Sequence, residues 1–367
     1  MERNIMKNIV LADSVDRLIN IDFHGKGLYP IYDVIRQKMG LPLTYMAAKG
    51  ILDCLAGKKN ATTIIGTGFL IDPFKKPETD GLVGAALLAR ALDILFDTTL
   101  VIVTEEEAVE TLKWTCLAAE LLVCDDVITA QENPNTVCII PFSKDEETAR
   151  AAADRMLADL KPELMVSIER AGKNSYGTYH AGLGGKINYK VAKIDYLFEE
   201  VRKRGGFTIG VGDLGNELGV GNAWQEMQKL IPFGEKCTCG CGGGTVTNTV
   251  SCAPLIGASS EIAIYGLLAV LKGMTGNNDV LHSSVLQKQI LWECAMHGAV
   301  DGQTKRPSAT IDSMSSESVE RIVELLHDLV YHNEKHYEVR PEFLDFLAAQ
   351  EQSLFKPCSK KIEKTVP

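Results

Sequence analysis

The sequence predicts an α/β fold: a mainly parallel sheet with helices on both faces, a helical N-terminal segment and a helical C-terminal region. Short apolar runs typical of buried strands recur along the chain at 61–70, 99–104, 137–141, 163–169 and 206–211. Helical segments lie between most of these runs. Strands that alternate with helices of about 10 to 15 residues need crossover connections, and such connections produce parallel strands.

The helices are predicted from apolar residues spaced three and four positions apart. These segments are residues 31–39, 47–55, 79–95, 106–122, 145–160, 194–204, 280–296 and 316–332. Pro30 and Pro42 punctuate the first two segments, as expected near helix boundaries.

We divide the chain into three parts. Residues 1–60 form a helical N-terminal segment packed on the core, residues 61–335 the α/β domain, and residues 336–367 a C-terminal helix and basic tail. The last residues, 357–367, are rich in lysine and are expected to fray.

The composition excludes some classes of protein. Of the 367 residues, 46% are hydrophobic and 23% are charged, which is typical of a folded chain with a large core. Lysine and arginine number 38 and aspartate and glutamate 48, so the net charge is −10. A surface this acidic argues against nucleic-acid binding, which needs a basic face.

The chain shows no pattern of a membrane span or an export signal. The longest apolar candidate, 254–271, is interrupted by Ser259, Ser260 and Glu261, whereas a span needs about 20 apolar residues. Residues 1–13 lack the apolar stretch of a signal peptide. The ten cysteines are scattered, as in reduced intracellular proteins. We therefore expect a cytoplasmic protein that binds neither membrane nor nucleic acid.

Four segments that carry glycine or polar residues come at the ends of predicted strands. They are residues 67–68 together with 80–81, residues 169–170, residues 212–221 and residues 258–261. In open parallel sheets, ligands bind at the carboxyl ends of the strands. We therefore expect these segments to form one active site.

The most glycine-rich of them has five glycines between 210 and 221, where glycine permits a close approach of the backbone to a ligand. Gly210, Gly212 and Gly215 satisfy the dinucleotide pattern G-x-G-x-x-G, but a single match is a weak signal. Asp213 would place a carboxylate where a pyrophosphate should meet backbone N–H groups. We therefore expect no nucleotide cofactor.

Two interpretations of the same segment remain. It could be a tight turn with polar caps, in which Asn222 caps the next helix and Gln225 takes the reciprocal capping position. Alternatively, Asp213, Asn216 and Glu217 form a site.

The predicted strand over 163–169 delivers a charged pair, Glu169 and Arg170, to the edge of the sheet. Arg170 could bind a substrate carboxylate with two hydrogen bonds, and Glu169 could serve as a general base or a metal ligand. The alternative is a structural ion pair.

Two helix starts are also candidates. Asp80 precedes a helix and could be either a site residue or a simple cap. Ser259 or Ser260 caps a later helix, whose N-terminus would attract an anion. That segment could equally be a capped core helix.

Cys237, Cys239 and Cys241 form a C-x-C-x-C pattern rather than the C-x2-C pairs usual for zinc. In an extended chain the three sulfur atoms would share one face. We leave open a metal or redox role, with Cys252 as a further ligand, a glycine-rich loop that approaches a ligand, and a simple loop.

Together these segments resemble the C-terminal domain of D-glutamate cyclase and the bacterial single-domain proteins like it. The family pattern matches at 79–86 (Thr-Asp-Gly, then Gly-Ala-Ala), 168–172 (Ile-Glu-Arg-x-Gly), 177–179 (Gly-x-Tyr), 209–221 (Ile-Gly-x-Gly-Asp-x-Gly-Asn-Glu-x-Gly-x-Gly) and 299–302 (Ala-Val-Asp-Gly). The order holds over about residues 60 to 310, most of the chain.

The sequence departs from the family pattern at two places. Leu214 replaces a glycine of the Gly-Asp-Gly-Gly-Asn-Glu signature, and residues 258–261 replace Ser-Asn-Trp-Gly. If the Asn-Trp pair of the family contacts substrate, the specificity of this chain differs.

The resemblance implies a hydro-lyase that interconverts D-glutamate and 5-oxo-D-proline. For such a reaction we expect Glu217 or Asp213 to act as the base. Either a divalent metal held by Asp213, Glu217 and Glu169 would act as Lewis acid, or a general acid would take its place. The oxygen ligands suit Mg²⁺ or Mn²⁺. Arg170 would hold the α-carboxylate.

The other expected substrate contacts come from the strand ends, the glycine-rich loop and the helix starts. They are Thr67, Gly68, Asp80, Gly81, Tyr179, Gly212, Gly215, Asn216 and Ser260. The alternatives are a hydrolase of a related lactam or cyclic amide, and a binding protein for an amino acid or carboxylate. The partner is a small molecule in each case, and we expect a homo-oligomer on general grounds.

Overall fold

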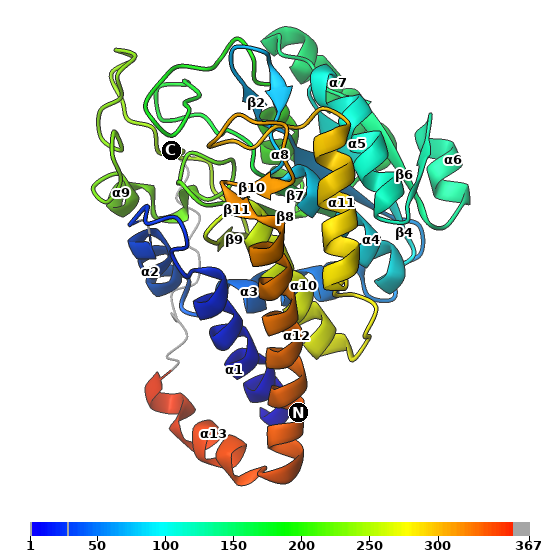
Figure 1. The fold of residues 1–367 in the computed structure, drawn as a ribbon, viewed down its shortest axis with the longest axis vertical. Coiled ribbons are helices and arrows are strands. Elements are labelled where there is room, and N and C mark those ends of the chain that lie inside the picture. The colour runs from blue at the N-terminus through cyan, green and yellow to red at the C-terminus, as the bar shows by residue number, and fades with distance from the viewer. Residues whose placement is uncertain (1, 28, 355–367) are drawn as a thin grey trace.

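A seven-stranded parallel sheet forms the centre of the protein in a computed structural model that describes residues 2–27 and 29–354 (Figure 1). The strand order is β5-β6-β4-β1-β7-β8-β9. The seven strands are β1 (Ala61–Thr67), β4 (Thr98–Thr104), β5 (Leu122–Cys124), β6 (Thr136–Pro141), β7 (Leu164–Ile168), β8 (Phe207–Gly212) and β9 (Ala253–Ile256). Four short strands pair outside the sheet: β2 (Leu70–Ile71), β3 (Lys76–Pro77), β10 (Thr310–Ile311) and β11 (Met314–Ser315).

Helices precede, connect and follow the strands. The first seven are α1 (Glu2–Ile19), α2 (Tyr29–Met39), α3 (Leu43–Leu55), α4 (Leu82–Leu95), α5 (Glu106–Ala118), α6 (Val127–Glu132) and α7 (Glu146–Leu160). The others are α8 (Ile194–Lys203), the 3₁₀ turn η1 (Gly221–Ala223), α9 (Trp224–Met227), α10 (Ser260–Thr275), α11 (Ser284–Met296), α12 (Ser316–Val339) and α13 (Glu342–Leu354).

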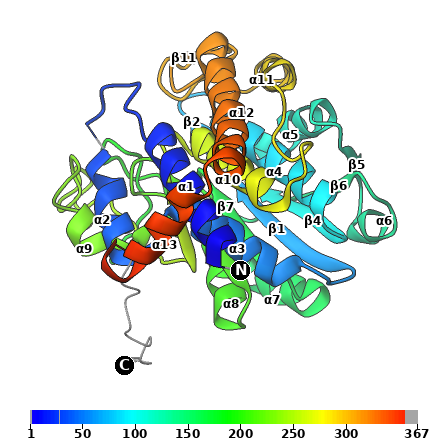
Figure 2. The same ribbon diagram turned by 90° about the horizontal axis from the view of Figure 1, so that it is seen from below.

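The sheet separates two apolar cores. Neighbouring residues of a strand point to opposite faces, and Ile64 of β1 accordingly packs with α7 and α8 whereas Ile65 packs with α3, α4 and α10. Figure 2 shows α7 and α8 on one side of β1 and β7, and α10 and α12 on the other. Helix α10 lies under α1 and α12 and is buried over 260–271. The apolar run at 254–271 is therefore a strand and a core helix.

The sheet extends from β1 to both sides. The chain first builds β4, β5 and β6 on one side of β1, and then returns to place β7, β8 and β9 on the other side. The carboxyl ends of the neighbouring strands β1 and β7 therefore mark the topological switch point, where open α/β sheets bind ligands. Thr67 pairs with Ile168 at this edge.

The predicted fold class is confirmed, and the differences lie in element bounds and in short elements that were not predicted. The strand predicted over 61–70 ends at Thr67, and the helix predicted over 106–122 ends at Ala118, where β5 soon follows. Strands β5 and β9 and helix α6 were not predicted, because all three are short. Helix α12 continues through the boundary at 335, and the basic tail at 357–367 lies outside the described residues.

The predicted cap at Asn222 is wrong. Its side chain bonds to the backbone of Ser251, donating to the carbonyl at 3.0 Å and accepting from the N–H at 3.2 Å. This amide therefore joins two loops instead of capping a helix. The predicted cap at Ser259 is confirmed, because its side chain accepts a hydrogen bond from the N–H of Ile262.

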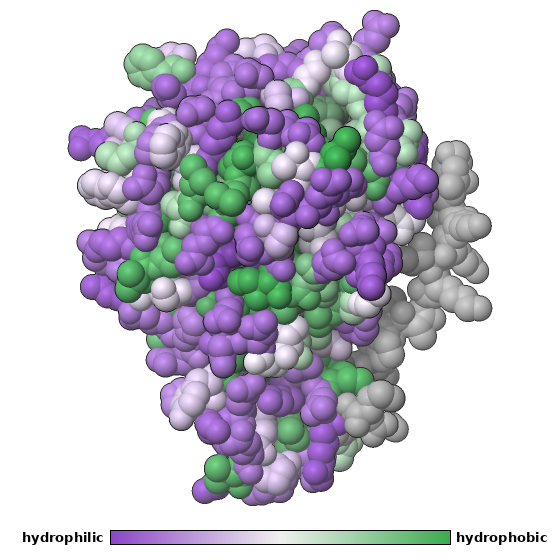
Figure 3. All heavy atoms as spheres, turned by 90° about the vertical axis from the view of Figure 1, so that its right-hand side faces the viewer, coloured by the Kyte–Doolittle hydropathy of each residue, from purple (hydrophilic) through white to green (hydrophobic). Residues whose placement is uncertain are grey.

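Hydrophilic residues predominate on the face that carries α5, α6 and α11, and apolar residues form separate patches there (Figure 3). Among the described residues, no helix has both the length and the apolar character needed to cross a membrane.

Candidate active site

Helices α4 and α10 begin side by side at the switch point, and each is capped by a carboxylate from the other's N-terminal segment. Asp80 accepts from the N–H of Glu261 at 2.7 Å and of Ser260 at 3.2 Å. Glu261 in turn accepts from the N–H of Gly84 at 2.7 Å and of Gly81 at 3.1 Å. Asp80 therefore caps α10 rather than the helix that follows it. The positive ends of the two helices therefore face the carboxylates of Asp80 and Glu261.

Glu169 lies directly beyond β7 and is buried. Its φ is +48°, a left-handed conformation that is uncommon outside glycine and that costs energy. Ser260 donates a hydrogen bond to Glu169 Oε2 at 2.6 Å. A Cβ atom at Gly81 would lie 2.6 Å from the Cβ of Glu169. Glycine at 81 is therefore required for the carboxylate to occupy this position.

Glu217 folds back over the loop that follows β8. Its oxygens accept hydrogen bonds from the N–H groups of Leu214 at 3.0 Å and Gly215 at 2.8 Å. The carboxylate lies so close to Gly212 that a side chain there would collide with it. The glycines of this loop thus make room for a carboxylate instead of a phosphate.

The three carboxylates of Glu169, Asp213 and Glu217 form one group, which we call the acidic triad. One oxygen from each lies within 4.8 Å of the others. Burial, and after it the charge of Asp213, raises the pKa of Glu169 well above its usual value and that of Glu217 to about 8. Three carboxylates this close cannot all be ionised unless a cation compensates their charge. Without a cation, at least one of them binds a proton. The triad is thus suited to bind a cation or to transfer protons.

Three further charged residues surround the triad and were not predicted from the sequence. Lys26 Nζ lies 2.7 Å from Asp213 Oδ2 and 2.8 Å from Asp312 Oδ2. Burial opposes the charge of Lys26, but these two carboxylates outweigh it and raise the pKa of the lysine. Burial, and then the charge of Asp312, raises the pKa of Glu78 well above its usual value. Glu78 directly precedes the segment 79–86 that carries the family pattern, whereas Lys26 and Asp312 belong to no motif.

A small pocket lies beside Lys26 and Asp213. It is lined by the segment that follows α1, by the end of β9 and by Asp213; its residues are Asn20, Asp22, Lys26, Asp213, Ile256, Gly257 and Ala258. The N-terminal segment therefore contributes one wall of the candidate site.

Arg170 is buried and uses its guanidinium within the protein. Nη1 donates to Glu105 at 2.5 Å and to the carbonyl of Gly68, and Nη2 donates to the carbonyl of Ala192 at 2.9 Å. A structural ion pair was the alternative that the sequence left open, and the partner is Glu105. These bonds tie the ends of β1, β4 and β7 together.

The remaining predicted substrate contacts differ in whether their side chains have an atom free to form a hydrogen bond with a substrate. Thr67 Oγ1 and Asn216 Oδ1 are buried and have no hydrogen-bond partner within the described chain. Asn216 Nδ2 donates to the carbonyl of His180 at 3.1 Å. Tyr179 is buried and donates its hydroxyl hydrogen to Asp195 at 2.5 Å. Thr67 and Asn216 thus keep a free polar atom, whereas the hydroxyl of Tyr179 is engaged.

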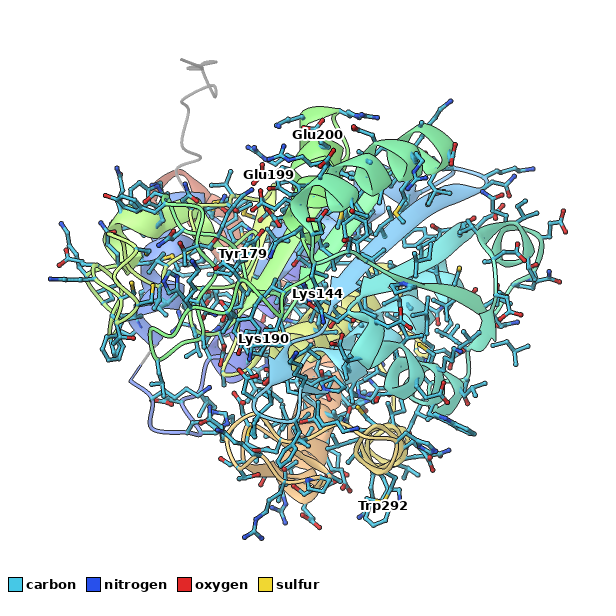
Figure 4. The ribbon with its side chains drawn as sticks, turned by 90° about the horizontal axis from the view of Figure 1, so that it is seen from above. Lys144, Tyr179, Lys190, Glu199, Glu200 and Trp292 are labelled. Carbon is cyan, nitrogen blue, oxygen red and sulfur yellow. The ribbon has the colours of Figure 1, made fainter. Side chains whose placement is uncertain are left out.

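The segment 169–193 contributes many of these residues. Tyr179 and Lys190, both from this segment, lie near the centre of the molecule when it is seen from above (Figure 4). Lys190 Nζ donates to Asp72 at 2.8 Å and to the carbonyl of Leu70 at 2.5 Å, which joins the segment to the β2–β3 hairpin.

Cys237, Cys239 and Cys241 lie together, and His180 completes the group. The sequence pointed to Cys252 as the additional residue, but its thiol lies 3.5 Å from the hydroxyl of Thr208. We call His180 and the three cysteines the Cys/His cluster.

The fold and the site define an α/β domain with a group of buried carboxylates at its topological switch point. Comparison with protein families places it further. The family model for the D-glutamate cyclase-like C-terminal domain matches residues 15–327, so the chain belongs to this family.

One curated relative is the human protein D-glutamate cyclase, mitochondrial. It is 38% identical to this chain over 76 residues, which are 20% of this chain and 12% of the relative. The chain therefore matches only a small part of that protein's length.

Proposed function

We propose that the protein is a hydro-lyase that interconverts D-glutamate and 5-oxo-D-proline. The observation that carries the proposal is the buried acidic triad beside Lys26, at the switch point of a chain that belongs to the D-glutamate cyclase-like family. In the forward direction the amine attacks the γ-carboxyl carbon, the lactam C–N bond forms, and one γ-oxygen leaves as water.

This reaction needs a group that removes a proton from the ammonium and a group that protonates the departing oxygen. Asp213 is paired with Lys26, and we assign it the first role. Glu217, with its pKa raised to about 8 by burial and by Asp213, carries a proton near neutral pH and can supply it. In the reverse direction the two roles exchange.

The charge of the site favours a divalent cation. Glu169, Asp213 and Glu217 offer hard oxygen ligands within reach of one ion, which suits Mg²⁺ or Mn²⁺. Such an ion would relieve the repulsion within the triad and would lower the pKa of Glu217. With the ion bound, polarisation of the γ-carboxyl group by the metal would therefore take the place of the proton supplied by Glu217.

The substrate carboxylates need cationic or N–H partners. We expected Arg170 to bind the α-carboxylate, but its bonds to Glu105, Gly68 and Ala192 leave it a positioning role. Lys26 lies in the pocket beside Asp213. Asp213 and Asp312 use two of the three N–H donors of its ammonium, and we now favour the third for this contact. Thr67 and Asn216 have free polar atoms for the rest of the substrate.

Opening of a related lactam is the second candidate reaction. Ser260, where the family pattern has a different sequence, contacts Glu169 directly, so a change at 258–261 reaches the triad. The three convergent carboxylates favour an enzyme over a pure binding protein.

We further propose that the protein acts in the cytoplasm and as a homo-oligomer, which fractionation and size-exclusion chromatography with light scattering would test.

The test is chiral chromatography of the purified protein incubated with D-glutamate, L-glutamate and both 5-oxoprolines, each with Mn²⁺, Mg²⁺ or EDTA. Metal-dependent conversion of the D pair alone supports the proposal. Conversion of none of the four, with the protein folded, contradicts it and directs the search to other lactams.

A further inference from the structure

The Cys/His cluster has the composition and spacing of a site for a single metal ion. Cys237 Sγ lies 3.2 Å from Cys239 Sγ and 3.5 Å from Cys241 Sγ. His180 Nε2 lies 3.3 Å from Cys239 Sγ and 3.7 Å from Cys241 Sγ. All four atoms lie within 4.8 Å of one another.

These separations are close to those around tetrahedral zinc, although the sulfur atoms lie somewhat nearer to one another. A zinc ion bonds thiolate sulfur at about 2.3 Å and imidazole nitrogen at about 2.0 Å, which places two sulfurs about 3.8 Å apart and a sulfur and a nitrogen about 3.5 Å apart. A disulfide would need a sulfur separation of about 2.05 Å, and the nine cysteines of the described chain are free thiols. Four protein ligands are typical of a structural rather than a catalytic zinc site.

The surrounding chain indicates why an ion is needed there. The ligands come from two segments, 169–193 and 228–252, that contain no helix or strand among the described residues. Thr238 donates to the carbonyl of Gly184 at 2.9 Å, and Asn174 donates to Cys241 Sγ at 3.5 Å. These bonds hold the two segments in register around the sulfur atoms.

We propose that His180, Cys237, Cys239 and Cys241 bind one structural zinc ion. The ion requires three thiolates and a neutral imidazole, so binding displaces the thiol protons. His180 connects the cluster to the active-site loop, because its carbonyl accepts the hydrogen bond from Asn216. A zinc ion would thus brace the loop that carries Asp213 and Glu217 without touching substrate.

The test measures metal content by plasma mass spectrometry in full-length protein purified from zinc-supplemented cells and dialysed against EDTA. We expect one zinc per chain in the wild type, in Asp213→Asn and in the control Cys252→Ser, and less than half of that in Cys239→Ser. Zinc lost equally from Cys252→Ser or Asp213→Asn would overturn the assignment.

If Cys239→Ser does not fold, a second measurement on the wild type decides. Cobalt(II) added to zinc-depleted protein should give the intense visible absorption of tetrahedral Co²⁺ with thiolate charge-transfer bands, and zinc should bleach it. Wild-type protein that carries no zinc and gives no such spectrum, or that shows a disulfide among these cysteines by mass spectrometry, would contradict the proposal.

Discussion

The acidic triad and the Cys/His cluster are two groups of ligand-type side chains built in opposite ways. Two of the strands that end at the sheet edge, β7 and β8, present the triad, and buried hydrogen bonds hold its members. The cluster belongs to two irregular segments, 169–193 and 228–252, and none of its four residues lies in a strand of the sheet. If both proposals hold, the comparison teaches that the triad can form without a cation, because the ends of the sheet strands place it, whereas the cluster would rely on a bound ion for much of its order.

The largest expected effect is on turnover. Asp213→Asn or Glu217→Gln should lower kcat by about 10²- to 10⁴-fold, the usual contribution of general acid–base catalysis. Because the sheet positions both residues, the melting temperature should change little. Glu199→Gln, at a partly exposed residue that pairs with Lys173 at 3.8 Å, serves as the control and should remain active. A parallel loss of folding in the two site variants would make these residues structural.

The next effect is the pH dependence of stability. Burial and neighbouring carboxylates raise the folded-state pKa of Glu217 to about 8, and burial raises that of Glu261 to about 7. Such groups bind more protons in the folded state, so stability falls as pH rises from about 4.5 through these values, at roughly 1 kcal/mol per unit for each group.

Urea unfolding at several pH values in EDTA measures this slope, and Mg²⁺ or Mn²⁺ should flatten it by compensating the triad. Two results would show that the carboxylates are ionised and compensated in another way. One is an unfolding free energy that rises over the same pH interval, and the other is a slope that Mg²⁺ and Mn²⁺ leave unchanged.

A smaller effect is expected at the paired helix starts. Glu261→Ala removes the acceptor for two buried N–H groups, those of Gly81 and Gly84, and should cost about 2 kcal/mol of unfolding free energy. Glu132→Ala at an exposed position should cost less than about 0.5 kcal/mol. Equal losses in the two variants would remove the reciprocal caps from the account.

The smallest and most specific effect compares two glycine-to-alanine variants. Both strain the backbone, but only one brings a new Cβ atom into collision with a neighbouring residue. Gly81 and Gly276 both have positive φ, but only at Gly81 would a Cβ meet Glu169, and nothing lies within 4 Å at Gly276. Gly81→Ala should therefore cost about 1 kcal/mol more than Gly276→Ala, and it alone should lower kcat. Matching activities in the two variants would show that the position of Glu169 is unimportant.

The sequence predicted the triad because its members follow strands, and strand ends converge whatever the details of packing. It did not predict Lys26 or Asp312, which reach Asp213 from segments far away in the chain and outside any motif. His180 was missed for the same reason. Local patterns failed where a side chain had a better partner elsewhere, as Asp80 has in the start of α10 and Arg170 in Glu105.

The most direct test of the central claim follows oxygen. 5-Oxo-D-proline incubated in heavy-oxygen water with the wild-type protein and Mn²⁺ should give D-glutamate whose γ-carboxyl group contains one labelled oxygen at early times, by mass spectrometry. Asp213→Asn should give none. Labelled D-glutamate formed equally by Asp213→Asn, or no D-glutamate from the folded wild type, would contradict the account.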